Sequence, residues 1–223
     1  MTRLGQLLHA EIPTTRFPTM RVARIGAARA AAMAVAAFVE EATFVIGAGV
    51  DGLETPFNLE AMLFKFPRNS ELVYPTGSIV EVLGDRQAHN LSPTPMESTL
   101  DRYGPGTVLW KTAELVNEWQ LDFFVSDDAT QEAIRAALPA LFNPREDAAG
   151  VLLQGPEQYW CLPVRATLLG DPTTTTDSDE GILTGERRLM ARVRTEIDEV
   201  HLRKGNRLFR PVVRLDVRDP GNG

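Results

Sequence analysis

The chain has 223 residues, 43% of them hydrophobic, and a formal net charge of −7 with a sequence pI of about 5.1. This length allows a sizeable buried core, and the acidic balance argues against general nucleic-acid binding by the whole molecule. The single cysteine, Cys161, excludes an intrachain disulfide and a thiolate metal cluster. Because Trp160 and Leu162 flank it, we expect Cys161 to be a small, buried hydrophobic residue. We also expect the protein to fold in a reducing compartment.

The charge is unevenly distributed along the chain. Ten basic and five acidic residues lie between Glu186 and Arg218, which gives that segment +5 and the rest of the chain −12. Such asymmetry suits a molecule that contacts copies of itself through unlike surfaces. A solvated sheet face of mixed charge with no particular role accounts for it equally well.

The N-terminal region predicts an arm followed by a helix. Residues 1–20 combine an amphipathic start with Pro13 and Pro18, a pattern typical of an N-terminal arm that ends in a turn. The alanine-rich run from Arg21 to about Thr43 predicts a core or interface helix. Its uncharged stretch, Ala30–Val39, is too short to span a membrane and lies too far from the start for a signal peptide.

Residues 47–106 are rich in glycine and proline and predict an irregular insertion, with short strand-like runs at Met62–Phe66 and Ser78–Leu83. The segment Gly47–Gly52 matches the G-x-G-x-x-G pattern of dinucleotide sites. Pro56 would leave only a stunted helix to hold phosphate, and a helix precedes the motif where a doubly wound sheet would open with a strand. We therefore favour a glycine-rich turn and predict no cofactor. An enzyme that binds a nucleotide cofactor through this segment is the less favoured alternative.

The middle of the chain predicts a strand-then-helix unit. Strands are expected at Thr107–Lys111 and Leu115–Val125, followed by a helix over Thr130–Phe142. Ser126, Asp127 and Asp128 supply N-cap candidates between strand and helix. The polar face of the second strand consists of Glu118, Gln120 and Asp122.

The C-terminal third predicts more strands. Val151–Gln154 and Tyr159–Leu169 are expected to be strands, and the polar run Gly170–Gly181 an exposed loop whose spacing fits no EF-hand. Arg187–Leu202 fits both a helix and a strand, and its β-branched content favours one long strand, followed by another at Phe209–Val217.

Together these elements predict a single α+β domain over residues 21–217 with a flexible tail at 218–223. The chain has no nucleophile elbow, phosphate loop ending in Gly-Lys-Ser/Thr, or H-E-x-x-H zinc motif. We therefore predict no catalytic residue, no metal site and no enzymatic activity.

Three segments resemble the tail terminator proteins of tailed phages. They are Gly106–Glu114, then Trp119–Phe124 with the helix at Ala129–Phe142, and the Arg-Pro-hydrophobic strand Arg210–Val217. The similarity covers roughly residues 107–217. It implies an α+β subunit with a twisted, mostly antiparallel sheet and helices packed on one face, to which this chain adds a long loop insertion.

The resemblance also implies a function. Six copies would form a ring at the head-proximal end of the tail, terminate tube polymerisation and join the tail to the head connector. The partners would be other copies, the tail tube protein and head-side connector or neck proteins, with a sheath as a further candidate. DNA would pass through the lumen without sequence-specific binding, and no membrane would be involved. Such a virion protein of the tail or neck would assemble in the host cytoplasm. A neck, collar or sheath-adjacent protein, or an injection-system cap, is the alternative.

Three arginines of the predicted strand Arg187–Leu202 share one face, opposite its apolar residues. We hypothesise that this face meets an acidic surface on the next subunit or on the tube protein, because the planar guanidinium group holds carboxylates in a fixed geometry. The candidate interface residues are Arg188, Arg192, Arg194, Asp177, Asp179, Glu180, Glu118 and Asp122.

Overall fold

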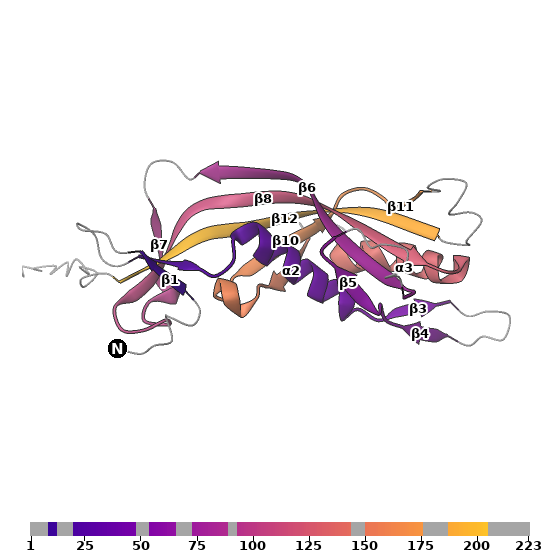
Figure 1. Cartoon of the computed structure of the whole chain (residues 1–223), viewed down its shortest axis with the longest axis horizontal. Coiled ribbons are helices and arrows are strands. Elements are labelled where there is room, and N and C mark those ends of the chain that lie inside the picture. Colours follow the sequence, from indigo (N-terminus) through magenta and orange to yellow (C-terminus); the bar gives the residue numbers. More distant parts are fainter. Residues whose placement is uncertain are drawn as a thin grey trace, which may run out of the picture.

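A curled, mostly antiparallel sheet, a separate pair of short strands and two α-helices make up the described part of the chain in the computed structural model (Figure 1). The structure describes residues 9–12, 20–47, 54–65, 73–88, 93–143, 150–175 and 187–204, and every structural statement below concerns those residues. In chain order the elements are β1 (His9–Ile12), β2 (Met20–Ala23), α2 (Ala27–Glu40), β3 (Phe44–Ile46), β4 (Thr55–Phe57), β5 (Ala61–Leu63), β6 (Thr76–Ala88), β7 (Thr94–Met96), the 3-10 helix η2 (Glu97–Thr99), β8 (Thr107–Val125), α3 (Asp128–Phe142), β9 (Val151–Gln154), the 3-10 helix η3 (Glu157–Tyr159), β10 (Pro163–Leu168), β11 (Thr173–Thr175) and β12 (Arg187–Lys204).

Three long strands form the middle of the sheet. β6 has 13 residues, β8 has 19 and β12 has 18. β12 pairs with β8 along its whole length, and β6 and β7 pair with the other side of β8. The far side of β12 pairs in turn with β11, β10 and β2, and β9 pairs with β10. Among the described strand pairs only the short contact between β5 and β6 is parallel.

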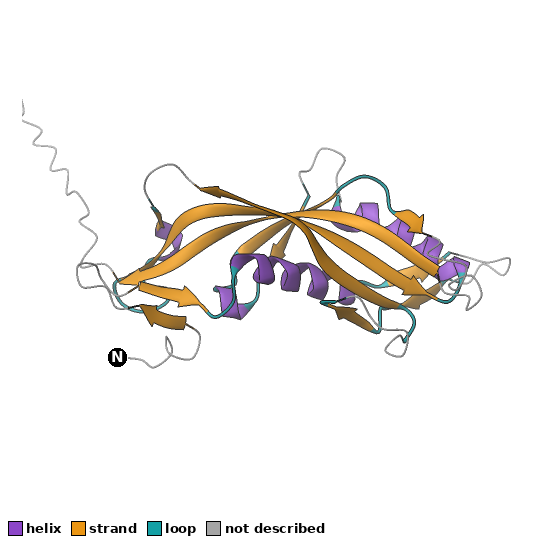
Figure 2. Cartoon of the chain, turned by 45° about the horizontal axis from the view of Figure 1, so that its top comes forward, coloured by secondary structure: helices purple, strands orange, loops and turns teal. Residues whose placement is uncertain are grey.

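Two bulges accompany the curl of the sheet, which is visible in Figure 2. Val82 of β6 has no partner in β8, and Thr112 of β8 has no partner in β12. The hydroxyl of Thr112 donates a hydrogen bond to the carbonyl of Glu199 at 3.1 Å. An extra residue of this kind bends its strand and increases the local twist.

Both helices pack on the same face of the sheet (Figure 2). α3 buries Ile134, Leu138 and Phe142 at four-residue spacing, and the Phe142 ring meets Phe38 of α2 edge to face at 5.6 Å. The buried side of α2 is almost entirely alanine, which brings the helix close to the strands. Its buried residues are Ala27, Ala30, Ala31, Ala32, Ala34, Val35, Ala36 and Val39.

Hydrogen bonds of Tyr159 connect the turn after η3 to β12. Its phenol donates to the carbonyl of Asp198 at 3.0 Å and accepts from the amide of Val200 at 3.4 Å, next to the bulge. Burial raises the pKa of Tyr159 well above its ordinary value, so the phenol stays neutral. Trp160 and Cys161 follow with φ of 58° and 52°, left-handed values that end the 3-10 turn and reverse the chain into β10.

The predicted class is confirmed as a mixed α and β fold with a mostly antiparallel sheet and two helices. The predicted strand-then-helix unit is present, although the strands expected at Thr107–Lys111 and Leu115–Val125 form one continuous strand. The bulge at Thr112 explains the difference, because it breaks the two-residue period without breaking the pairing with β12. The long strand expected at Arg187–Leu202 is also confirmed.

The strand-like run predicted at Ser78–Leu83 is part of a longer strand, so the prediction of an irregular insertion over residues 47–106 is wrong for Thr76–Ala88. β6 lies there and pairs with β8 from Thr76 to Ala88. The bulge at Val82 and two glycines hide its alternation in the sequence. Gly77 leaves room for Met62, because a Cβ there would lie 2.0 Å from the sulfur of Met62 in its present position.

The predicted helix from Arg21 begins later, at Ala27, because Met20–Ala23 is a strand that pairs with β1 and with β12. Residues 9–12 of the predicted arm therefore belong to the sheet. The strand Tyr159–Leu169 is shortened at its start by η3 and the turn. The strand predicted at Phe209–Val217 and the tail at 218–223 lie outside the described residues.

We predict that Asp127→Ala destabilises the protein by about 1 kcal/mol, the usual cost of losing a helix N-cap. Asp127 accepts hydrogen bonds from the amide and the hydroxyl of Thr130, both at 2.8 Å. The backbone hydrogen bond from Thr130 is the main reason why the pKa of Asp127 is lowered. A lowered folded pKa means that the stabilisation is present above the unfolded value of about 3.9 and is lost as pH falls through the folded value.

Urea unfolding of wild type and variant, at neutral and at acidic pH, measures this difference. Glu132→Ala is the matched control, since its carboxylate is 71% exposed on the same helix and caps nothing. If wild type and Asp127→Ala differed in free energy of unfolding by the same amount at acidic and at neutral pH, Asp127 would not act as a charged cap.

Candidate functional site: the open face of the sheet

The sheet face opposite the two helices is the candidate site, and we call it the open face. Along β12 the residues Leu189, Ala191 and Val193 are buried toward the helices, while the residues between them point the other way. Neither described helix packs on this side (Figure 2). The charged and amide residues of the open face are Glu114, Glu118, Gln120, Asp122, Arg165, Arg188, Arg192, Arg194, Glu196 and Asp198.

Strand register brings the predicted interface residues of β8 and β12 together. Arg194 lies opposite Glu118, and Arg192 lies opposite Gln120. Directly opposed side chains on one face of an antiparallel pair have Cβ atoms about 5 Å apart and interact. The predicted polar faces of the two strands therefore form one continuous surface.

Arg188 and Asp122 are partners of each other. The Nε of Arg188 donates to Oδ1 of Asp122 at 2.9 Å, and the Asp122 carboxylate has no exposed surface. The amide of Gln120 donates to both carboxylate oxygens, at 3.1 and 3.0 Å. A buried carboxylate with these partners holds β12 in register on β8, so the structure gives both residues a role inside the subunit.

Arg192 and Arg194 are the arginines that the open face presents to solvent. Both are exposed, and Arg192 forms no ion pair within the described part of the chain. Arg194 contacts Glu196 at 3.2 Å, with its side chain 44% exposed. An exposed pair of this kind is worth about 0–1 kcal/mol, so a partner molecule can replace it at little cost.

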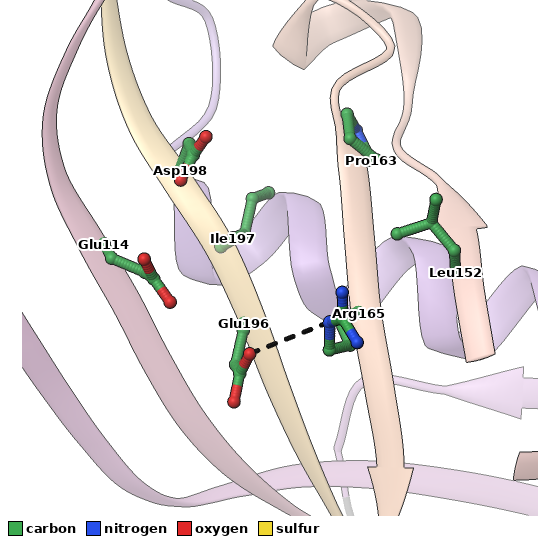
Figure 3. Close-up of a pocket in the computed structure, with 7 residues that line it drawn as sticks. All are labelled: Glu114, Leu152, Pro163, Arg165, Glu196, Ile197 and Asp198. Carbon is green, nitrogen blue, oxygen red and sulfur yellow. Dashed lines mark ion pairs between the residues drawn. The ribbon is translucent and has the colours of Figure 1, made fainter. Parts of the chain in front are cut away.

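A shallow depression of about 240 Å³ lies further along the open face (Figure 3). Lys111 lies beside it, donating to Glu114 at 3.1 Å and forming an ion pair with Asp198. Burial lowers the pKa of Lys111, but the hydrogen bonds to Asp198 and Glu114 outweigh it, and the net shift is upward. The depression is lined by Glu114, Leu152, Pro163, Arg165, Glu196, Ile197 and Asp198.

The open face carries charges of both signs along its length, and most of them are paired. Along β12 three arginines come first, and Glu196 and Asp198 follow on the same face. Glu114 adds a third carboxylate opposite Asp198. This arrangement offers charge-assisted hydrogen bonds and ion pairs to another macromolecule. Within the described residues no group of three or more His, Cys, Asp or Glu side chains is placed to hold a metal ion.

Other residues singled out in the sequence fall elsewhere. Asp177, Asp179 and Glu180 lie outside the described residues, as does most of Gly47–Gly52. Cys161 is half-buried in the turn after η3, so the expectation of a fully buried cysteine within a strand is wrong.

Sequence reasoning missed Lys111, Arg165, Glu196 and Asp198. The two-residue period from Arg192 onward could have placed Glu196 and Asp198 beside the arginines. The position of Lys111 and Arg165 depends on pairing between distant strands, for which the sequence gives no local signal.

No described helix is long and apolar enough to cross a membrane.

Neither a protein-family model nor a curated protein sequence matches the chain.

We predict that Arg188→Met lowers the free energy of unfolding by about 3–5 kcal/mol, because it leaves the buried Asp122 carboxylate without its counterion. The double variant Asp122→Leu/Arg188→Met should recover most of that loss, since it removes the buried charge together with its partner.

Chemical denaturation of the three proteins in parallel measures the coupling. Arg192→Met on the same face is the matched control and should change stability by less than about 0.5 kcal/mol. Additive losses in the double variant would show that the two side chains do not act as a pair.

Proposed function

We propose that the chain is a structural subunit of a phage tail, of the tail terminator type, which acts by assembly and not by catalysis. The observation that supports this most directly is the open face, where the exposed Arg192 and Arg194 are followed along the same strand by the partly buried carboxylates of Glu196 and Asp198. Such a surface fits partners through complementary charge.

A face that carries arginines and carboxylates along one strand can meet a second copy in two ways. In a two-fold contact the arginines of each copy meet the carboxylates of the other, and in a head-to-tail contact each copy uses two different surfaces. A heterologous contact repeated from copy to copy closes into a ring if the rotation allows, and otherwise builds a filament. A ring is the form that the resemblance to tail terminators implies, with six copies at the head-proximal end of the tail. Arg192 and Arg194 are then available to an acidic surface of the next subunit or of the tail tube protein.

The remaining parts of the proposal come from the resemblance alone. The ring would stop tube polymerisation, join the tail to head-side connector or neck proteins, and let DNA pass through its lumen. A neck or collar protein, a sheath-adjacent protein or an injection-system cap would present the same kind of surface. Attachment to isolated tails separates a terminator from these alternatives.

We predict that Arg192→Glu/Arg194→Glu abolishes ring formation, tail attachment or both. Charge reversal places like charges together at the contact, which costs several kcal/mol. Native mass spectrometry and negative-stain imaging measure the ring, and co-sedimentation with tails measures attachment. The wild-type contact should also weaken as salt rises, because exposed charges are screened within about 10 Å at 0.1 M ionic strength.

The matched control is Arg24→Glu/Arg135→Glu, which reverses two exposed arginines away from the open face. It should assemble as wild type does. A variant reversed at Arg192 and Arg194 that still forms rings and still attaches to tails would refute the assigned role of the open face.

A further inference from the structure

Residues Glu81–Asp85 of β6 are exposed on both faces and at one edge of the sheet. β5 pairs with β6 only from Thr76 to Ser78, so beyond that point β6 has no described neighbour on the side away from β8. Val82 and Leu83 are 47% and 57% exposed, and Glu81, Gly84 and Asp85 are exposed as well. In Figure 1 this part of β6 extends along the top of the molecule, away from the helices. Unpaired backbone groups along such an edge are a template for another strand.

The opposite margin of the sheet is a second free edge. β9 pairs only with β10 among the described strands, and it carries no charged residue. Leu152 at its centre is 66% exposed. Arg165 lies opposite Leu152 on β10, with its side chain 48% exposed, and both project on the open face (Figure 3).

The two edges are complementary in apolar surface. The register of β6 on β8 places Leu83 and Asp85 on the open face, opposite Glu118 and Val116. One edge therefore offers Leu83 and an aspartate, and the other offers Leu152, with Arg165 one strand further in and in contact with Glu196 at 3.9 Å. A bulge and acidic side chains discourage indiscriminate pairing along β6, and an apolar edge strand without charged residues does not repel them.

We propose that neighbouring copies of this chain join edge to edge, with β6 of one copy pairing with β9 of the next. The inference rests on the proposed assembly of copies and names the strands that make the contact. Every step from β9 through β10, β12 and β8 to β6 is antiparallel, so β9 and β6 run in the same direction within a copy. Rotation about an axis along the strands makes the new pair parallel and continues one sheet around the ring.

In this arrangement the sheet edges join the copies, and the open face stays available for another partner. Edge pairing keeps the open faces of adjacent copies on the same side of the joined sheet, because pairing extends a sheet in its own plane. Leu83 would then lie near Leu152 of the next copy. Arg192 and Arg194, on the central strand β12, would remain uncovered for a different partner such as the tube protein.

Cross-linking with a short bis-maleimide tests the strand assignment. The background is Cys161→Ser, which removes the free cysteine. Two single-cysteine proteins, Leu83→Cys and Leu152→Cys, are mixed and should yield a covalent dimer that neither gives alone. A protein with both cysteines should yield a ladder that stops at the ring size found by native mass spectrometry. Leu100→Cys, an exposed leucine on neither edge, is the control for random collisions.

The outcomes separate this inference from the proposed function. Rings that form without any Leu83–Leu152 cross-link would overturn the edge contact and leave the assembly proposal standing. A dimer from Leu83→Cys alone would replace it by two-fold pairing of β6 with β6. A chain that stays monomeric in native mass spectrometry would overturn both proposals.

Discussion

Pairing between β8 and β12 is the constraint on which the rest of the molecule depends. Every residue of β12 pairs with β8, from Arg187 opposite Val125 to Lys204 opposite Thr107. All other strands of the large sheet are attached, directly or through one neighbour, to one of these two. A slip of one residue would move Arg192 and Arg194 into the space against the helices and the buried valine and leucine side chains into solvent. The register is therefore fixed by burial along its whole length.

Polar contacts at the two ends of this ladder reinforce the register. Near one end Arg188 is paired with the buried Asp122, and near the other Lys111 is held by Glu114 and Asp198 next to the bulge. The first is costly to disrupt because its carboxylate has no access to water. The second is partly exposed and contributes less. The charges that fix the subunit are thus distinct from Arg192, which has no ion pair within the described residues.

Much of this architecture could be predicted from local sequence patterns, and the rest depends on contacts between distant residues. The two-residue period of β8 and β12 and the Asp127 cap are local signals, and each led to the correct element. Only Ser78–Leu83 of β6 was predicted, because Val82 adds a residue to the strand, which shifts the alternation that follows. The partnership of Arg188 with Asp122 spans 66 positions, so the sequence could place both on polar faces but could not pair them. Cys161 was misplaced because left-handed backbone at Trp160 and Cys161 reverses a run that looks like a strand.

An edge contact and a face contact would respond to solution conditions in opposite ways. Strand pairing at β6 and β9 would rest on backbone hydrogen bonds and on the exposed Val82, Leu83 and Leu152, which salt screens little. Contacts through Arg192 and Arg194 would be ionic and exposed, and would weaken as salt rises. These two kinds of contact imply that the ring survives high salt while its attachment to a partner fails. Whether the ring closes would then depend on the curl of the sheet, because the twist between adjacent strands, increased at the bulges of β6 and β8, sets the angle between one copy and the next.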